Sequence, residues 1–232
     1  MTRVVVIIPA LNEADAIAQV VRAIPAAIVH HVIVVDGGST DGTVEAAGTA
    51  GAEVVVQPQR GYGNACRAGV DTARDADVLV FLDGDGSFDP AQIALLVAPI
   101  LADQAELVLG SRELGGISLA SMPPQQRFGN RLVAWLLRRL YGLQITDVGP
   151  FRAIRRDTLE LLQMSEPTYG WPTEMIVKAA RRKVRMVEVP TSYRARIGGK
   201  SKVSGTVRGS VLAGYQMLAL TVKYAWPRSS HR

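Results

Sequence analysis

The sequence of 232 residues is poor in the residue types on which several common chemistries depend. It contains one cysteine, Cys66, and three histidines, and aromatic residues make up 6% of it. A single cysteine excludes an internal disulfide and a metal site built from several cysteines. We expect Cys66 to pack as a small apolar side chain rather than to act as a nucleophile. The scarcity of aromatics, without a zinc or helix-turn-helix pattern, argues against nucleic acid as a partner.

Long uncharged apolar runs are also missing. The N-terminus enters a predicted strand within three residues and has no signal-peptide pattern, which fits a cytoplasmic protein. The segment from Val207 to Trp226 is mostly apolar, but Arg208 and Lys223 limit its uncharged stretch to 14 residues, too few to span a bilayer. Aromatic and basic residues near its ends instead predict an interfacial amphipathic helix. A core helix or a dimer contact is the open alternative.

The charge is divided unevenly along the chain. The formal net charge is +5, yet residues 1–151 carry 10 Lys/Arg and 16 Asp/Glu, whereas residues 152–232 carry 16 and 5. A cationic C-terminal region of this kind suits a polyphosphate substrate or an anionic membrane surface.

The first half of the sequence alternates short β-branched runs with amphipathic segments. This pattern predicts an α/β fold, a single domain with a mostly parallel central sheet and helices on both faces. The expected strands are 3–8, 32–35, 53–56, 78–82 and 106–109, with helices between them. The first of these helices is expected to open at Asn12 and Glu13.

The fourth expected strand ends in an acidic pair. Five apolar residues, Val78 to Leu82, are followed by Asp83 and Asp85 among glycines. In isolation, an ordinary solvated turn explains such a sequence better than a site does. However, the carboxyl edge of an open α/β sheet is where ligands bind, and carboxylates there suit Mg²⁺ or Mn²⁺ holding a phosphate.

Two further loops are expected at the same edge, because parallel strands end together. They are residues 9–13 and 36–43, both polar or rich in glycine. Neither is a phosphate-binding loop of the Gly-x-x-x-x-Gly-Lys type or a dinucleotide fingerprint. This weakens the case for an ATPase or a dehydrogenase.

These motifs carry a family resemblance. Residues 9–13, 36–43, 83–85 and 110–112, in that order and spacing, resemble the inverting family 2 glycosyltransferases of the GT-A fold. The later segments 147–152, 170–174, 188–190 and 196–202 are similar to those of dolichyl-phosphate or polyprenyl-phosphate sugar synthases that transfer mannose or glucose. The resemblance covers roughly residues 3–205. It implies a catalytic domain at 1–205 and a C-terminal amphipathic helix and tail at 206–232.

The resemblance implies a donor site at the acidic edge. Mg²⁺ or Mn²⁺ would be held by Asp83 and Asp85 against the diphosphate of the donor. Two positions depart from the family pattern: Gly37 stands where many relatives have Asp, and Ser87 stands where some synthases have Gln. The residues implied in nucleotide-sugar binding are Pro9, Ala10, Leu11, Asn12, Glu13, Asp36, Gly37, Gly63, Asp83 and Gly84.

The resemblance also implies a cationic acceptor site. The residues expected to hold a lipid phosphate are Arg112, Arg127, Arg196 and Lys202, and the implied catalytic residues are Asp85, Asp147, Arg112, Arg127 and Arg196. Asp147 would orient the acceptor or the metal, or have a structural role. Glu174 resembles a family position near the acceptor and could equally brace a nearby arginine. An ionised phosphate acceptor needs no strong general base. This agrees with the lack of a credible catalytic histidine, because His30 and His31 lie beside a predicted turn and His231 lies in the tail.

The sequence therefore predicts transfer of a sugar from a UDP- or GDP-sugar to a polyprenyl or dolichyl phosphate. The reaction is expected at the cytoplasmic membrane face, through peripheral contact or a membrane partner subunit. One alternative is a glycosyltransferase for a soluble or polysaccharide hydroxyl, with Asp147 or Glu174 as base. Another is a catalytically silent subunit that binds nucleotide sugars. The motifs do not decide the nucleotide, the sugar, the prenyl length or whether the chain forms a homo-oligomer.

Overall fold

The computed structural model describes residues 2–116, 122–198 and 207–225, and the backbone alone at 207–213. Seven strands are present in this part of the chain: β1 Val4–Ala10, β2 His31–Asp36, β3 Glu53–Val56, β4 Val78–Phe81, β5 Leu107–Ser111, β6 Arg152–Arg155 and β7 Met186–Pro190. The helices are α1 Ile17–Arg22, α2 Thr43–Thr49, α3 Tyr62–Thr72, the 3-10 turn η1 Pro90–Gln92, α4 Ile93–Leu101, α5 Pro124–Tyr141, α6 Arg156–Leu162, α7 Trp171–Arg181 and α8 Val207–Lys223.

The seven strands form one mixed sheet in the order β3-β2-β1-β4-β6-β5-β7. β3, β2, β1 and β4 are parallel neighbours, as are β5 and β7, while β6 runs antiparallel between β4 and β5. The mostly parallel sheet expected from the sequence is confirmed. Since β1, β2 and β4 run the same way, the loops that follow them open at one edge, which positions the site.

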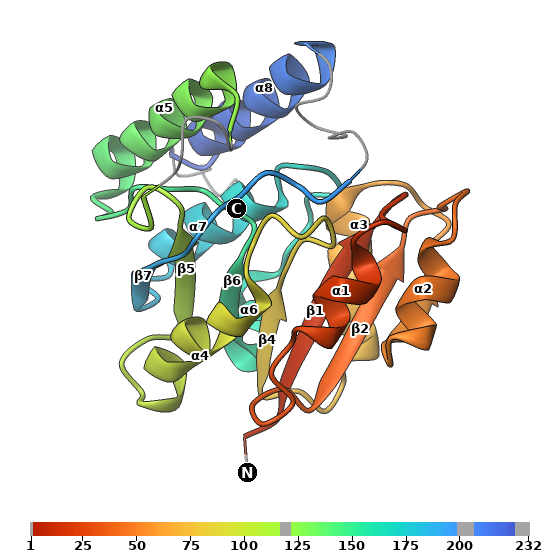
Figure 1. Cartoon of the computed structure of the whole chain (residues 1–232). Coiled ribbons are helices and arrows are strands. Elements are labelled where there is room, and N and C mark those ends of the chain that lie inside the picture. Colours follow the sequence, from red (N-terminus) through yellow and green to blue (C-terminus); the bar gives the residue numbers. More distant parts are fainter. Residues whose placement is uncertain (1, 117–121, 199–206, 226–232) are drawn as a thin grey trace, which may run out of the picture.

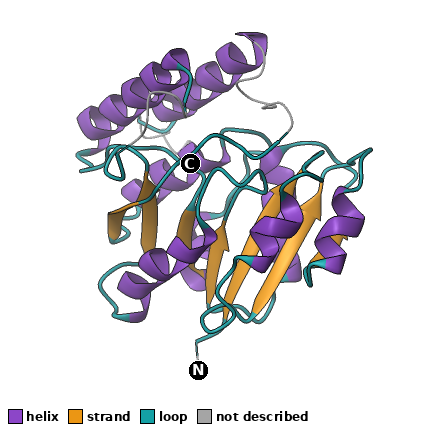
Figure 2. Cartoon of the chain, viewed as in Figure 1, coloured by secondary structure: helices purple, strands orange, loops and turns teal. Residues whose placement is uncertain are grey.

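Helices cover both faces of the sheet, as Figure 2 shows. α1, α2 and α4 pack on one face through a core that includes Ile17, Ala47 and Leu96. α3, α6 and α7 pack on the other, where Cys66 is fully buried beside the sheet, as expected of a small apolar residue. The periodicity of the buried positions, such as 17, 20 and 21 in α1, explains why these segments form helices here.

α5 and α8 extend this second core and lie side by side at the top of Figure 1. The hydroxyl of Tyr141 in α5 donates to the carbonyl oxygen of Thr221 in α8 at 2.7 Å. Leu220 and Thr221 are buried, so α8 packs one side on the protein. No helix in the described ranges combines the length and the apolar character needed to cross a bilayer.

Candidate functional site at the carboxyl edge of the sheet

The loops after β1 and β2 are joined by hydrogen bonds. The Asn12 amide N–H donates to Ser39 Oγ, and the Thr40 N–H donates to Asn12 Oδ1, both at 2.8 Å. The Glu13 N–H donates to Thr43 Oγ1 at 2.8 Å. Asn12 has a left-handed backbone, with φ of 52°, so the chain cannot continue directly into a helix. The expected helix start at Asn12 and Glu13 was wrong, since α1 begins at Ile17.

Four more of the residues predicted to bind the nucleotide sugar lie at this edge, namely Pro9, Ala10, Asp36 and Gly37. Pro9 and Ala10 end β1 opposite Val35 and Asp36 of β2. The buried Asp36 carboxylate accepts bonds from the N–H groups of Gly38 and Ser39, and the Gly37 N–H donates to the Ala10 carbonyl. These contacts fix the loop that follows β2.

Gly84 packs beneath the acidic pair. A Cβ there would lie 3.1 Å from Ile17 Cδ1 and 3.2 Å from Ile8 Cγ2. A side chain at this position would press the acidic loop away from β1, so the glycine allows the loop to lie close to the sheet.

Asp83 and Asp85 are half-buried at the end of β4. Burial, together with the neighbouring Asp85 carboxylate, raises the pKa of Asp83 to about 7. The Ser87 N–H donates to Asp85 Oδ1 at 2.9 Å and fixes that carboxylate within its loop. The charge of Asp85 therefore opposes ionisation of Asp83, whereas a cation beside them would favour it.

This donor set fits a divalent cation. No cluster of three or more His, Cys, Asp or Glu side chains that could hold a metal occurs in the described chain, so the protein would supply two carboxylates. Mg²⁺ and Mn²⁺ accept such a set when phosphate and water oxygens complete the coordination. A bound cation would offset the burial and the repulsion by Asp85 that together raise the pKa of Asp83.

A strap formed by residues 193–198 crosses the acidic loop. The Arg196 guanidinium donates to both Glu13 carboxylate oxygens at 2.8 Å and lies 3.8 Å from Asp85 Oδ2. The Ile197 N–H donates to the Asp85 carbonyl at 3.0 Å. Gly86, with φ of 74°, admits the Ile197 side chain, because a Cβ there would meet Ile197 Cδ1 at 2.4 Å. The strap thus brings Arg196 between two of the predicted donor-side carboxylates.

Arg112 and Asp147 form a buried ion pair beside this edge. Arg112 donates to Asp147 through its backbone N–H and Nε at 2.8 Å and through Nη2 at 2.7 Å. Asn130 of α5 donates to Asp147 Oδ1 at 2.7 Å. Burial opposes ionisation of Asp147, but the charge and bonds of Arg112 outweigh it and hold the Asp147 pKa below its usual range. Burial opposes the charge of Arg112, but the carboxylate of Asp147 and, more weakly, that of Asp83 hold the Arg112 pKa above its usual value.

Three residues hold this pair in place: Glu188, from the segment 188–190 that carried the family resemblance, and Tyr193 and Asn130, which the sequence reasoning missed. The Glu188 carboxylate accepts bonds from the N–H groups of Thr146 and Asp147 at 2.8 to 3.0 Å and so fixes the Asp147 loop. The guanidinium carbon of Arg112, Cζ, lies over the Tyr193 ring, 5.2 Å from the centroid of that ring. Neither Tyr193 nor Asn130 stands in a motif, although Asn130 follows Arg127 by three residues and shares its side of a helix.

Arg127 is engaged by an acid that the sequence analysis did not single out. Its Nε lies 3.3 Å from Glu113 Oε1, and Arg131, also in α5, donates to the same carboxylate at 3.0 Å. Glu113 directly follows Arg112 in the sequence, so Arg127 lies near Arg112, one of the other predicted acceptor residues. Lys202 lies outside the described residues.

Gly63 and Glu174 lie in a packed region instead of among the loops described above. A Cβ at Gly63 would meet the Glu166 carbonyl oxygen at 2.0 Å, so Gly63 allows α3 to approach the loop before α7. The Glu174 carboxylate is fully buried, accepts bonds from Ser165 and Glu166, and pairs with Lys178 at 2.8 Å. Glu174 therefore has a bracing role, but the expectation of an arginine partner was wrong, because the cation that it pairs with is Lys178.

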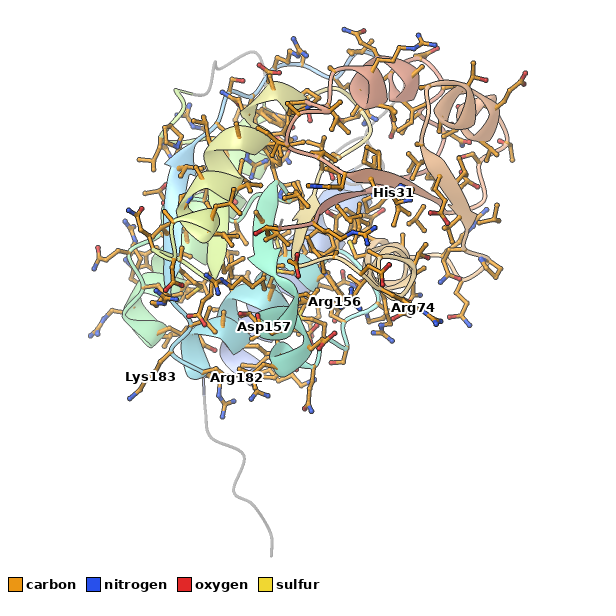
Figure 3. All side chains as sticks on the ribbon, turned by 90° about the horizontal axis from the view of Figure 1, so that it is seen from below. His31, Arg74, Arg156, Asp157, Arg182 and Lys183 are labelled. Atoms are coloured by element: carbon orange, nitrogen blue, oxygen red, sulfur yellow. The ribbon has the colours of Figure 1, made fainter. Side chains whose placement is uncertain are left out.

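The opposite edge of the sheet carries other polar residues. Figure 3, seen from below, shows His31 and Arg156 there. His31 Nε2 pairs with Glu53 at 2.6 Å, and Arg156 pairs with Glu160 at 2.9 Å. His30 and His31 stand at the start of β2, whereas the acidic loops follow the ends of the strands. Neither histidine therefore serves the candidate site.

The sequence matches known glycosyltransferases. The profile of Glycosyl transferase family 2 matches residues 5–162, more than half of the chain. The "uncharacterized glycosyltransferase" of Mycobacterium tuberculosis is 40% identical over 210 residues, 90% of this chain and 94% of that protein. The undecaprenyl-phosphate mannosyltransferase of Micrococcus luteus is 32% identical over 235 residues, 96% of each chain. The chain belongs to glycosyl transferase family 2.

Solved structures share the fold. Glucosyl-3-phosphoglycerate synthase of Mycobacterium tuberculosis, in complex with phosphoglyceric acid, has a TM-score of 0.79 at 24% identity, over 98% of this chain and 82% of that one. Another structure of that synthase contains Mn²⁺ and UDP-glucose and has a TM-score of 0.77. The expected GT-A type α/β fold is confirmed.

Proposed function

We propose that this protein transfers a sugar from a UDP- or GDP-sugar to the phosphate of a polyprenol, with inversion at the anomeric carbon. The observation that carries this proposal is the close approach of fixed cations to an acidic edge. Arg196 reaches both Glu13 and Asp85, and Arg112 is buried beside them. An anionic acceptor held by such cations would lie next to a nucleotide diphosphate held at the acidic pair.

The donor side rests on the three joined loops. Asn12, Glu13 and Asp36 would line the base and ribose pocket, and Asp83 and Asp85 would hold Mg²⁺ or Mn²⁺. When bound, the cation would neutralise charge on the departing nucleotide diphosphate. The structural relative that was crystallised with Mn²⁺ and UDP-glucose supports this use of the fold.

The acceptor side rests on the arginines. Asp147 takes one side of the Arg112 guanidinium, through Nε and Nη2, and this fixes the orientation of the group. Arg196 and Arg127 would add charge around the same phosphate, and Lys202 belongs to the same predicted set. The name of the Micrococcus luteus relative supports an undecaprenyl-type acceptor.

A hydroxyl acceptor would require a general base, and the two candidates are poorly suited to that role. The Asp147 oxygens accept bonds from Arg112 and Asn130, and its pKa is held low. Burial opposes ionisation of Glu174, but bonds from Lys178 and Ser165 hold its pKa low as well. A carboxylate with a lowered pKa is a weak base, so the phosphate acceptor is favoured.

A lipid acceptor requires contact with a membrane. The protein would bind the cytoplasmic leaflet peripherally or through a membrane partner subunit. The basic C-terminal third, with 16 Lys/Arg against 5 Asp/Glu from residue 152 onward, supports contact with anionic lipid.

The test is turnover with a panel of UDP- and GDP-sugars, Mg²⁺ or Mn²⁺, and a short-chain prenyl phosphate. We expect a prenyl-phosphate sugar whose anomeric configuration, read by NMR, is opposite to that of the donor. Transfer to glycerol or sugar hydroxyls alone would replace this function with the hydroxyl-acceptor alternative. Nucleotide protection against thermal unfolding without any transfer would support the silent subunit.

A further inference from the structure

The outer face of α5 is apolar although it does not face the core. The helix buries one side against the protein, formed by Asn130, Val133, Ala134 and Leu137. On the opposite side, Phe128 is 70% exposed and Trp135 is 51% exposed. These two residues are seven positions apart, or two helical turns, so they form one stripe. Large exposed aromatics on one face of a helix are typical of an interaction surface.

α8 continues this apolar surface. Tyr215 is 68% exposed and Val222 is 44% exposed, and Ala219 between them is exposed as well. Their spacing of four and three residues places them on one face of the helix, opposite the buried Leu220 and Thr221. Because α5 and α8 lie side by side at the same end of the molecule, the two stripes belong to one surface (Figure 1).

The charge on these two helices has one sign. α5 and α8 together contain no Asp or Glu, and their six cations are Arg127, Arg131, Arg138, Arg139, Arg208 and Lys223. Arg138 and Arg139 are exposed and form no ion pair with any residue that the structure describes. Two copies of this chain meeting through such a face would bring like charges together. An anionic lipid surface would instead neutralise them.

The same helix contributes to the acceptor site from its inner side. Asn130 of α5 donates to Asp147, which in turn holds Arg112. A phosphate held by Arg112 would therefore lie beneath a helix whose other side carries Phe128 and Trp135. This relation is what a membrane-embedded acceptor requires, since its prenyl chain stays in the bilayer while its phosphate enters the protein.

We propose that the outer face of α5 and α8, centred on Phe128, Trp135 and Tyr215, docks on an anionic lipid bilayer. Docking presents the phosphate of an embedded prenyl lipid to Arg112. This inference rests on the proposed function, because it identifies the surface through which that acceptor arrives.

The direct test is sedimentation of the full chain with vesicles. One set contains phosphatidylcholine alone and the other also contains anionic phosphatidylglycerol. The Phe128→Ser/Trp135→Ser variant should bind the anionic vesicles about tenfold more weakly, because two interfacial anchors are lost. Arg138→Gln and Arg139→Gln should each weaken binding to anionic vesicles about fivefold and leave binding to neutral vesicles unchanged.

A matched control uses exposed leucines elsewhere. Leu101 at the end of α4 is 54% exposed and Leu161 in α6 is 53% exposed, which is close to the exposure of Trp135. Leu101→Ser/Leu161→Ser should bind vesicles as the wild type does. Equal binding by the wild type and the Phe128→Ser/Trp135→Ser variant would overturn the proposal. A dimer in solution that this variant abolishes, without vesicle binding, would assign the face to a second copy instead.

Activity separates this inference from the proposed function. The Phe128→Ser/Trp135→Ser variant should keep wild-type turnover on a water-soluble, short-chain prenyl phosphate and lose most of its turnover on a polyprenyl phosphate embedded in vesicles. Equal turnover of both proteins on the embedded lipid would refute docking while the function stands. If the wild type binds vesicles through this face but transfers sugar to neither acceptor, the proposed function fails and the docking surface remains.

Discussion

Removing the charge of Asp147 should expose how strongly the Arg112 site depends on its buried ion pair. The exposed fractions of the Arg112 and Asp147 side chains are 6% and 1%, and Arg112 makes three bonds to this carboxylate. Asp147→Asn keeps the shape but leaves the guanidinium buried without a counter-charge. Loss of one partner of a buried pair costs about 3–5 kcal/mol. This is a large part of the stability of an ordinary domain, which is about 5–15 kcal/mol.

Urea unfolding measures this loss. With a slope of about 3 kcal/mol per molar, the midpoint should fall by about 1–1.7 M. Asp103→Asn is the matched control, because Asp103 pairs with Arg155 and Arg185 at the surface, where its side chain is 71% exposed. We expect that control to unfold at the wild-type midpoint. An unchanged midpoint for Asp147→Asn would refute the assignment of stability to the buried pair.

A double substitution separates stability from activity. In Arg112→Met/Asp147→Leu both charges are removed together, so no buried charge is left unpaired. The double variant should regain about 2 kcal/mol or more relative to Asp147→Leu alone. It should nevertheless transfer no sugar to a prenyl phosphate, because the acceptor cation is gone. Recovery of transfer together with stability would show that Arg112 has a structural role only.

Three further outcomes follow from the geometry of the site. Asp85→Asn should lower turnover about 100-fold or more, since one of the two proposed metal ligands is lost. It should also abolish Mn²⁺-dependent protection by the nucleotide in thermal unfolding. Unchanged turnover would remove Asp85 from the proposed metal site. Arg196→Ala should reduce transfer to the prenyl phosphate more than hydrolysis of the donor, and an equal effect on both rates would contradict its acceptor role. The pKa of Glu174 is below its ordinary value in the folded protein, so its ionisation stabilises the fold above the unfolded pKa of about 4.3, and this contribution is lost as the pH falls through the folded pKa. Wild type should therefore lose more stability than Glu174→Gln between about pH 4.5 and pH 3, and parallel melting curves would refute this.

The acidic edge could be predicted from the sequence because its features are local. A buried run that ends in Asp83 and Asp85 identifies a strand and the polar loop after it. Parallel strand order then brings this loop next to residues 9–13 and 36–43 without further information. The outcome at Asn12 shows where local reasoning failed, because its left-handed backbone is held by Ser39 and Thr40 from another loop.

The acceptor side depended on contacts between segments distant in sequence. Asp147 meets Arg112 across 35 positions, and Arg196 meets Glu13 across 183. No periodicity encodes such a pairing. It arises because β6 runs antiparallel to β5, so the loop before β6, with Asp147, lies at the edge where β5 ends. The loops after β1 and β7, with Glu13 and Arg196, open at the same edge.

The amino-acid sequence by itself determined the α/β class, the acidic strand end and the excess of cations in the last third, because propensity, hydrophobic pattern and charge are properties of neighbouring residues. Only the tertiary structure decided that Asp147 neutralises Arg112, that Glu174 braces Lys178, and that α5 and α8 lie side by side. The physical reason is that burial and pairing depend on which segments the fold brings together, and these factors decide whether a charge binds a ligand or stabilises the protein.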